Sequence, residues 1–169
     1  MHLLKIIKHT DLFSAYNFEG NDVKIRKAAR AVVFDGEKKI AMLEVVNHGY
    51  HKLPGGGVEK GESLAQALDR EVAEETGCKV LVLGEIGKII EHRDEWALRQ
   101  ESYCYLAKLV GKKGKPSFTE KEIADGFRVL WVSLDKAIEI MKNDQPDNYE
   151  GKFIKSRDLC FLEEIENIA

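Results

Sequence analysis

The chain has 169 residues, of which 44% are hydrophobic and 33% charged, and its formal net charge is −3. These values describe an ordinary globular protein with room for a sizeable core, and they exclude a disordered or fibrous chain. The slightly negative charge provides no general attraction to nucleic acids or anionic membranes, so an anionic substrate would need a local cation.

The three cysteines, Cys78, Cys104 and Cys160, are far apart and odd in number. This pattern predicts buried free thiols in a reducing compartment and not a disulfide or zinc framework. No segment approaches the roughly 18 apolar residues of a membrane span, and residues 1–16 lack the apolar run of a signal peptide. We therefore expect a cytoplasmic protein with neither a nucleic-acid nor a membrane partner.

The first third of the chain alternates apolar, β-branched runs with turn residues. Leu3–Ile7 predicts a short strand. Ala28–Phe34 and Ile40–Val46 flank turn residues that begin at Asp35, a pattern that predicts a β-hairpin. The glycine-rich segment Pro54–Gly57 predicts a loop that bends sharply or approaches another group closely.

Leu64–Thr76 is the strongest helix prediction in the sequence, because most of its residues are good helix formers. Ser63 and Gln66 have the spacing of a capping box at its start, and Gly77 suits the left-handed position after its end.

The remaining elements are predicted from apolar runs and helical periodicity. Strands are expected at Lys79–Ile90, Ser102–Val110 and Arg128–Val132, and helices at Leu134–Lys142 and Phe153–Ile168. No repeat or linker divides the chain, so we expect one mixed α/β domain over residues 1–169.

Three glutamates on the predicted helix, Glu71, Glu74 and Glu75, border its core-facing stripe. Like charges three or four residues apart destabilise a helix by about 0.2–0.5 kcal/mol per pair, and partial burial adds to this cost. A bound cation would reverse the sign of that effect, and Mg²⁺ prefers carboxylate ligands. The spacing alone also fits an acidic, solvent-exposed helix face.

The longer segment Gly56–Cys78 reads G-G-V-E-K-G-E-S-L-A-Q-A-L-D-R-E-V-A-E-E-T-G-C. It resembles the Nudix box, G-x5-E-x7-R-E-U-x-E-E-x-G-U, in which U is apolar. Val72 and Cys78 fill the apolar positions, and Cys78 is an unusual choice there. Every fixed position matches: Gly56, Glu62, Arg70, Glu71, Glu74, Glu75 and Gly77.

The resemblance implies a Nudix fold, an α/β/α sandwich around a mixed β-sheet, and a hydrolase acting on a phosphoanhydride. It implies Mg²⁺ as cofactor, with Mn²⁺ as a substitute. In the family the box glutamates bind the metal, which carries over to Glu71, Glu74 and Glu75, and the backbone carbonyl of Gly56 is a further ligand. Many members are dimers, so a homodimer is one option.

The arginine of the box, Arg70, is expected to pair with Glu62 and to orient the site, as in the family. Family members differ in which carboxylate acts as general base. Glu75 of the box and Glu122 of a later polar segment are the candidates here, and for Glu122 the alternative is an ordinary surface residue.

Four residues outside the box are expected to contact the substrate: Arg30, His51, Trp96 and Arg99. The two arginines suit phosphate groups, and His51 and Trp96 could stack on a nucleobase. Each also has a purely structural alternative, as a turn residue, a loop anchor or a dimer contact.

The family's marks of ADP-ribose, dinucleoside-polyphosphate and NADH specificity are absent from the sequence. By elimination we expect a (d)NTP or an oxidised (d)NTP such as 8-oxo-dGTP, cleaved to the nucleoside monophosphate and pyrophosphate. One alternative is an ADP-ribose, nucleotide-sugar or dinucleotide pyrophosphatase. Another is a non-catalytic nucleotide-sensing Nudix module, against which the intact box carboxylates argue.

Overall fold

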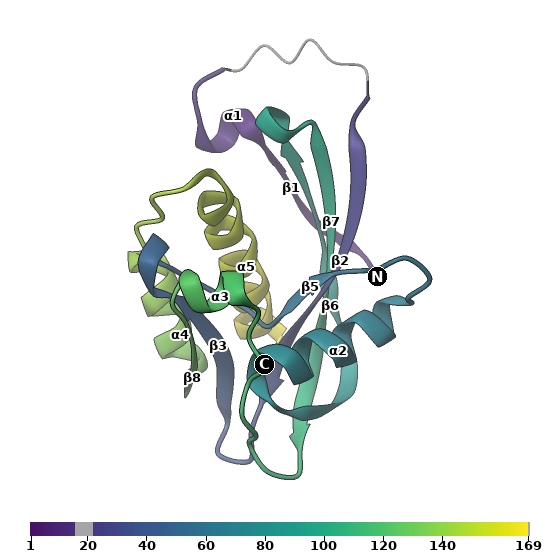
Figure 1. The fold of residues 1–169 in the computed structure, drawn as a ribbon, viewed down its shortest axis with the longest axis vertical. Helices are drawn as coiled ribbons and strands as arrows, with labels where there is room; N and C mark the ends of the chain where they lie inside the picture. The colour runs from purple at the N-terminus through teal and green to yellow at the C-terminus, as the bar shows by residue number, and fades with distance from the viewer. Residues whose placement is uncertain (16–21, 169) are drawn as a thin grey trace.

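The computed structural model describes residues 1–15 and 22–168 and shows a mixed eight-stranded sheet with helices on both faces (Figure 1). The strand order is β1-β6-β7-β2-β3-β4, with β5 paired to β2 and β8 to β3. The strands are β1 (Leu3–Lys8), β2 (Lys24–Phe34), β3 (Lys39–Val45), β4 (Tyr50–Lys52), β5 (Gly55–Gly57), β6 (Lys79–Arg93), β7 (Leu98–Val110) and β8 (Phe127–Ser133). The helices are α1 (His9–Leu12), α2 (Leu64–Thr76), α3 (Glu120–Ala124), α4 (Leu134–Asn143) and α5 (Tyr149–Ile168), with 3-10 turns η1 (Val46–His48) and η2 (Asp94–Trp96).

Strand β2 is the centre of the sheet. It pairs in parallel with β7 over its full length, and its residues Ala28–Arg30 pair with β5. Its ladder with β3 is limited to Phe34 opposite Ile40, so the predicted hairpin is confirmed only at its turn end. Beyond that point β3 turns away to pair with β4 and β8.

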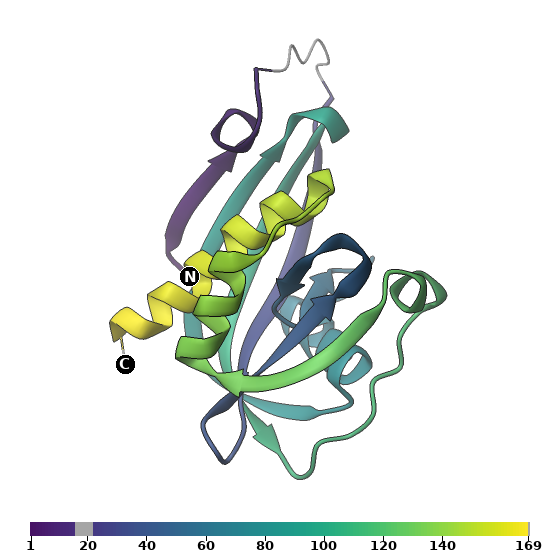
Figure 2. The same ribbon diagram turned by 90° about the vertical axis from the view of Figure 1, so that its left-hand side faces the viewer.

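The two faces of the sheet carry separate hydrophobic cores, which gives the predicted α/β/α layering (Figures 1 and 2). Val32 of β2 packs in the core shared with α4 and α5, where Phe153 is fully buried. Its neighbours Ala31 and Val33 pack in the core under α2 with Leu68. This alternation follows from the two-residue period of a strand.

Helix α2 has the predicted ends. Ser63 Oγ accepts a hydrogen bond from the Gln66 amide (3.2 Å), and the Ser63 amide donates to Gln66 Oε1 (2.9 Å), forming the capping box. Gly77 adopts the left-handed conformation (φ +69°), and a Cβ there would lie 2.4 Å from the Lys115 amide nitrogen. Only glycine fits this close approach of the 111–118 segment.

Helix α5 starts at Tyr149, before the predicted Phe153, because the side chain of Asn148 accepts a hydrogen bond from the Gly151 amide (2.8 Å) and caps it. No helix in the described part of the chain is long and apolar enough to span a membrane. Cys78 and Cys104 are buried as expected, Cys160 is partly exposed, and all three are free thiols.

A fully buried ionic cluster joins α5 to the sheet. The Arg157 guanidinium lies 2.6 Å from Asp158 and 3.6 Å from Glu91 of β6. Asp158 also accepts a hydrogen bond from the Leu53 amide (2.8 Å), shortly before the glycine-rich strand β5. Helix α5 therefore helps to fix the position of that strand.

Candidate active site

A pocket of about 250 Å³ opens between α2, β5, α3 and the start of α5. The box contributes its glycines, with Glu71 and Glu75 of α2, to one side. Basic residues and the elements opposite complete the lining: Arg26, Arg30, Lys52, Lys121, Tyr50, Phe127, Ile154, Thr119, Glu122, Asp125 and Glu150.

The glycine-rich strand β5 allows the box carboxylates to lie against the backbone. Gly55 has φ +134°, and a Cβ there would lie 2.1 Å from the carbonyl oxygen of Ala29. A Cβ on Gly56 would lie 2.3 Å from the Glu71 carboxylate. The buried Arg30 guanidinium donates to the Gly55 carbonyl, and burial lowers the pKa of Arg30 to about 10.

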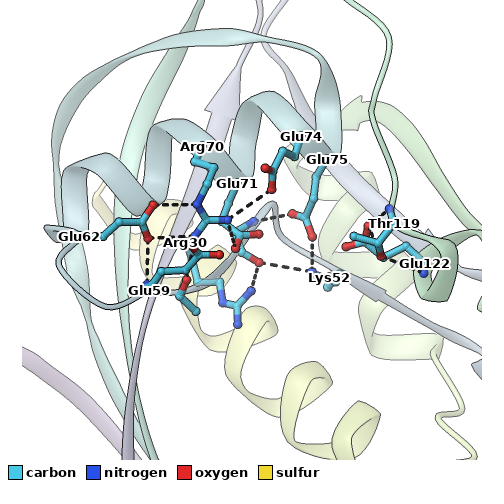
Figure 3. Close-up of polar contacts among 12 residues, drawn as sticks. Arg30, Lys52, Glu59, Glu62, Arg70, Glu71, Glu74, Glu75, Thr119 and Glu122 are labelled. Carbon is cyan, nitrogen blue, oxygen red and sulfur yellow. Dashed lines mark hydrogen bonds and ion pairs between the residues drawn. The ribbon is translucent and has the colours of Figure 1, made fainter.

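Glu75 is the most buried of the three box glutamates, with 2% of its surface exposed. Its Oε1 lies 2.5 Å from Lys52 Nζ, and its Oε2 accepts a hydrogen bond from the Gly55 amide (2.7 Å) (Figure 3). Burial raises the pKa of this carboxyl, and the neighbouring Lys52 opposes that shift. Glu75 thus borders the buried face of α2, as its place on the helix predicts.

Arg70 contacts three acidic residues of the box, Glu62, Glu71 and Glu74 (Figure 3). It makes two contacts with Glu62 (2.7 and 3.0 Å) and single contacts with Glu71 (2.8 Å) and Glu74 (3.3 Å). It also donates to the Gly57 carbonyl (3.0 Å). Hydrogen bonding from Arg70 lowers the pKa of Glu62 to about 2. The structure contains the Arg70–Glu62 pair that the resemblance implies.

Glu75 therefore pairs with Lys52, whereas Glu71 and Glu74 pair with Arg70. In the described ranges, 1–15 and 22–168, no three acidic, histidine or cysteine side chains are arranged to hold a metal ion together. The Glu74 side chain is 51% exposed and lies outside the pocket lining.

The residues present nevertheless fit a divalent cation. Glu71, Glu75 and Gly56 line the same pocket, and the Glu71 carboxylate lies 2.3 Å from the position that a Cβ on Gly56 would take. Carboxylate and backbone oxygens are the hard ligands that Mg²⁺ prefers. The assignment of Gly56, Glu71, Glu74 and Glu75 as ligands stays a prediction.

Glu122, the candidate base outside the box, lies in the pocket lining on α3. Its Oε2 accepts hydrogen bonds from the Thr119 amide (2.7 Å) and hydroxyl (3.0 Å), so the carboxylate closes a capping box. Figure 3 shows Thr119 and Glu122 on the opposite side of the site from Arg70. A proton-transfer role for Glu122 would require it to leave this capping arrangement.

His48 of η1 contacts Asp125, the residue that follows helix α3, on which Glu122 lies. Its ring nitrogens lie 3.0 Å from Asp147 and 3.3 Å from Asp125, the residue that ends α3. The neighbouring Asn47 amide donates to the Asp125 carbonyl (3.1 Å). The hydrogen bond to Asp147 raises the pKa of His48, with a smaller effect from Asp125.

This pKa shift predicts a pH dependence of stability. Because the folded-state pKa of His48 lies above its unfolded value, its contribution is complete below about pH 6.5 and is lost as pH rises through the folded pKa. The unfolding free energy of the wild-type protein should therefore fall as pH rises above about 6.5. In urea titrations, the unfolding free energy of His48→Gln should depend less on pH. Equal profiles would contradict the ion pairs, and an NMR titration of His48 checks the pKa directly.

Three of the predicted substrate contacts lie outside the pocket lining. His51 faces away from the pocket and hydrogen-bonds Asp144 through its amide (2.7 Å) and ring (2.8 Å). Trp96 packs on Tyr149 with ring centroids 5.2 Å apart, and Arg99 pairs with Glu101 (2.9 Å). Arg30 is the predicted contact that does line the pocket.

Lys52 and Glu150 are pocket residues that the sequence interpretation missed. The alternation of β4 offers a signal for Lys52, because Tyr50 and Lys52 must face one side of that strand and His51 the other. Glu150 had no such local signal, since its position depends on where α5 begins and on its contact with Arg93 (3.4 Å).

The family model for the NUDIX domain matches residues 24–153, more than half of the chain. The chain therefore belongs to the NUDIX domain family. This confirms the family and the fold class expected from the box.

Named relatives agree with this assignment. The chain is 35% identical over 88 residues to a protein of Mycobacterium tuberculosis (strain CDC 1551 / Oshkosh) named as a candidate mutator protein, MutT4. That match covers 48% of this chain and only 32% of the relative's length. Among solved structures, a NUDIX hydrolase from Nitrosomonas europaea superposes with a TM-score of 0.63 at 20% identity, covering 85% of this chain and 90% of that one. An ADP-ribose pyrophosphatase from Streptococcus suis 89-1591 has a TM-score of 0.53 at 23% identity, with 83% and 91% covered. These two structures share the fold.

Proposed function

We propose that the protein is a divalent-metal-dependent pyrophosphohydrolase that cleaves a (d)NTP, or an oxidised (d)NTP such as 8-oxo-dGTP, to the nucleoside monophosphate and pyrophosphate. One observation carries the proposal: the box carboxylates Glu71 and Glu75 share a single pocket with the basic side chains Arg26 and Arg30. Metal-binding and phosphate-binding groups are thus placed side by side.

Each part of the lining has a role in this proposal. Arg26 and Arg30 would neutralise phosphate oxygens, and Tyr50 and Phe127 provide aromatic surface for the organic group. A divalent cation held by Glu71, Glu74, Glu75 and the Gly56 carbonyl would stabilise charge at the cleaved linkage and lower the pKa of a bound water. Glu75 or Glu122 would accept the proton of the attacking water.

One named relative bears on the proposal. The relative from Mycobacterium tuberculosis carries the name of a mutator protein, and the alignment with it includes 48% of this chain. We keep a small-molecule nucleotide as the partner, a single domain over residues 1–169, Mg²⁺ as the cation and a homodimer as one option. The free thiols fit the expected cytoplasmic location.

A second candidate is a nucleoside-diphosphate sugar or ADP-ribose. Asp125 and Glu150 add two carboxylates to a pocket lining that also contains Phe127 and Ile154. Carboxylates accept hydrogen bonds from sugar hydroxyls as readily as from nucleobase amines.

A substrate panel with Mg²⁺ separates these candidates. We expect 8-oxo-dGTP and the common (d)NTPs to give the highest kcat/KM, with release of pyrophosphate and no orthophosphate. A higher kcat/KM for ADP-ribose or a UDP-sugar would favour the second candidate. Absence of hydrolysis across the panel would overturn the enzymatic proposal and favour a nucleotide-sensing module.

A further inference from the structure

Lys52 is a charged residue of the pocket to which the Nudix box assigns no role. It is the last residue of β4, shortly before the glycine-rich strand β5, and 8% of its surface is exposed. Its ammonium lies 2.5 Å from Glu75 Oε1 and donates to the Gly55 carbonyl (3.3 Å). Each Glu75 oxygen thus accepts a hydrogen bond from the segment that leads into the box.

The Lys52–Glu75 pair compensates charge at a buried position. A buried carboxylate is costly unless a cation or hydrogen-bond donors compensate it, and Lys52 and the Gly55 amide supply both. Arg30 adds a second positive charge that acts on Glu75 from within the protein. The carboxylate that the box assigns to a metal is therefore already neutralised by this chain's own cations.

A divalent cation on Glu75 would compete with Lys52 for the same oxygen. Two positive charges within a few ångströms of one carboxylate repel each other strongly in a poorly solvated site. Arg30 is fixed by burial and by its bond to the Gly55 carbonyl, whereas Lys52 has four rotatable bonds. Lys52 is consequently the group that can move.

Two further pocket groups lie near the Lys52 ammonium. The ammonium lies 5.4 Å from the centre of the Phe127 ring, and its charge acts on Glu150 across the pocket. Both residues line the pocket proposed to hold the substrate. A lysine that turns toward them would remain in the site as a phosphate-binding cation.

We propose that Lys52 is an internal counter-ion of Glu75 that a divalent cation displaces, and that the displaced ammonium then faces the substrate. This inference deepens the proposed function and rests on it. The pair therefore sets a threshold for metal binding, because the affinity for the cation is lowered by the free energy needed to break the Lys52–Glu75 contact.

Removal of the ammonium should strengthen metal binding. We expect Lys52→Met to bind Mn²⁺ about tenfold more tightly than wild type in an EPR or calorimetric titration. Lys121→Met is the matched control: Lys121 lines the same pocket but makes no ion pair within the described part of the chain. It should change the affinity about twofold at most. Equal changes in the two variants would reduce Lys52 to a general electrostatic effect and overturn the inference.

A second measurement needs no variant. An amine-acylating reagent, with mass-spectrometric readout, should modify Lys52 weakly after EDTA treatment and more strongly once Mn²⁺ is added. Lys5, exposed on β1, serves as the internal reference. Unchanged Lys52 acylation at saturating Mn²⁺, or no Mn²⁺ binding at all, would overturn the counter-ion role. If acylation rises while no nucleotide is hydrolysed, the proposed function fails and the counter-ion role stands.

Discussion

Glu75→Gln is expected to lower kcat by about 10²- to 10⁴-fold, since it removes the charge of the carboxylate proposed to hold metal or to accept a proton. The fold should persist, because glutamine has the same shape and its amide oxygen can still accept the hydrogen bond from the Gly55 amide. Steady-state kinetics on the preferred nucleotide, with circular dichroism and thermal unfolding alongside, provide the measurement.

Glu139→Gln is a suitable control for that experiment. Glu139 lies on α4, is 60% exposed, and pairs with Lys136 three residues earlier. Its substitution should leave turnover unchanged. Full activity in Glu75→Gln would contradict a catalytic or metal-binding role for Glu75, and a collapse of the fold would show that the Lys52–Glu75 pair is chiefly structural.

Gly55→Ala is expected to destabilise the protein by about 3 kcal/mol and to abolish most of its activity. An added Cβ would lie 2.1 Å from the Ala29 carbonyl oxygen and 2.8 Å from Arg30 Cα, and backbone atoms of the central strand cannot yield. The φ of +134° adds strain of its own. Strand β5 would also shift, and the residue 55 amide would lose its hydrogen bond to Glu75. Urea titration and activity assays on the same preparation measure both effects.

The matched control is Gly36→Ala in the β2–β3 turn, where an added Cβ meets no atom within 4 Å. We expect a change in unfolding free energy within about 0.5 kcal/mol there. If Gly55→Ala behaved like Gly36→Ala, the close packing of β5 on β2 would be disproved.

The elements that the sequence predicts well are those with local signals. The ends of α2 follow from Ser63, Gln66 and Gly77, whose capping chemistry lies within a few residues of each helix end. The layering follows from the period of apolar residues along β2 and α2. Family membership follows from the 23-residue Nudix box between Gly56 and Cys78, because seven fixed positions constrain it so strongly.

The candidate site was less predictable, because much of it depends on contacts between distant segments. The hydrogen bond between Asp158 and the Leu53 amide joins residues 105 positions apart, and no local sequence pattern predicts it. Trp96 and His51 have side chains suited to nucleobases, and tertiary packing assigns them to Tyr149 and Asp144 instead. The alternation of side chains along β4 places Lys52 on the same side as Tyr50. Its contact with Glu75 could not be predicted, because the two residues are brought together only by the fold.

We propose that Glu71 and Glu75 hold a divalent cation in this Nudix domain. The most direct test is a crystal structure of wild-type protein soaked in Mn²⁺ and measured at the manganese absorption edge. We expect the strongest anomalous peak in the pocket, within coordination distance of the carboxylates of Glu71 and Glu75. A strongest peak bound only by other residues, with Glu71 still on Arg70 and Glu75 still on Lys52, would contradict it.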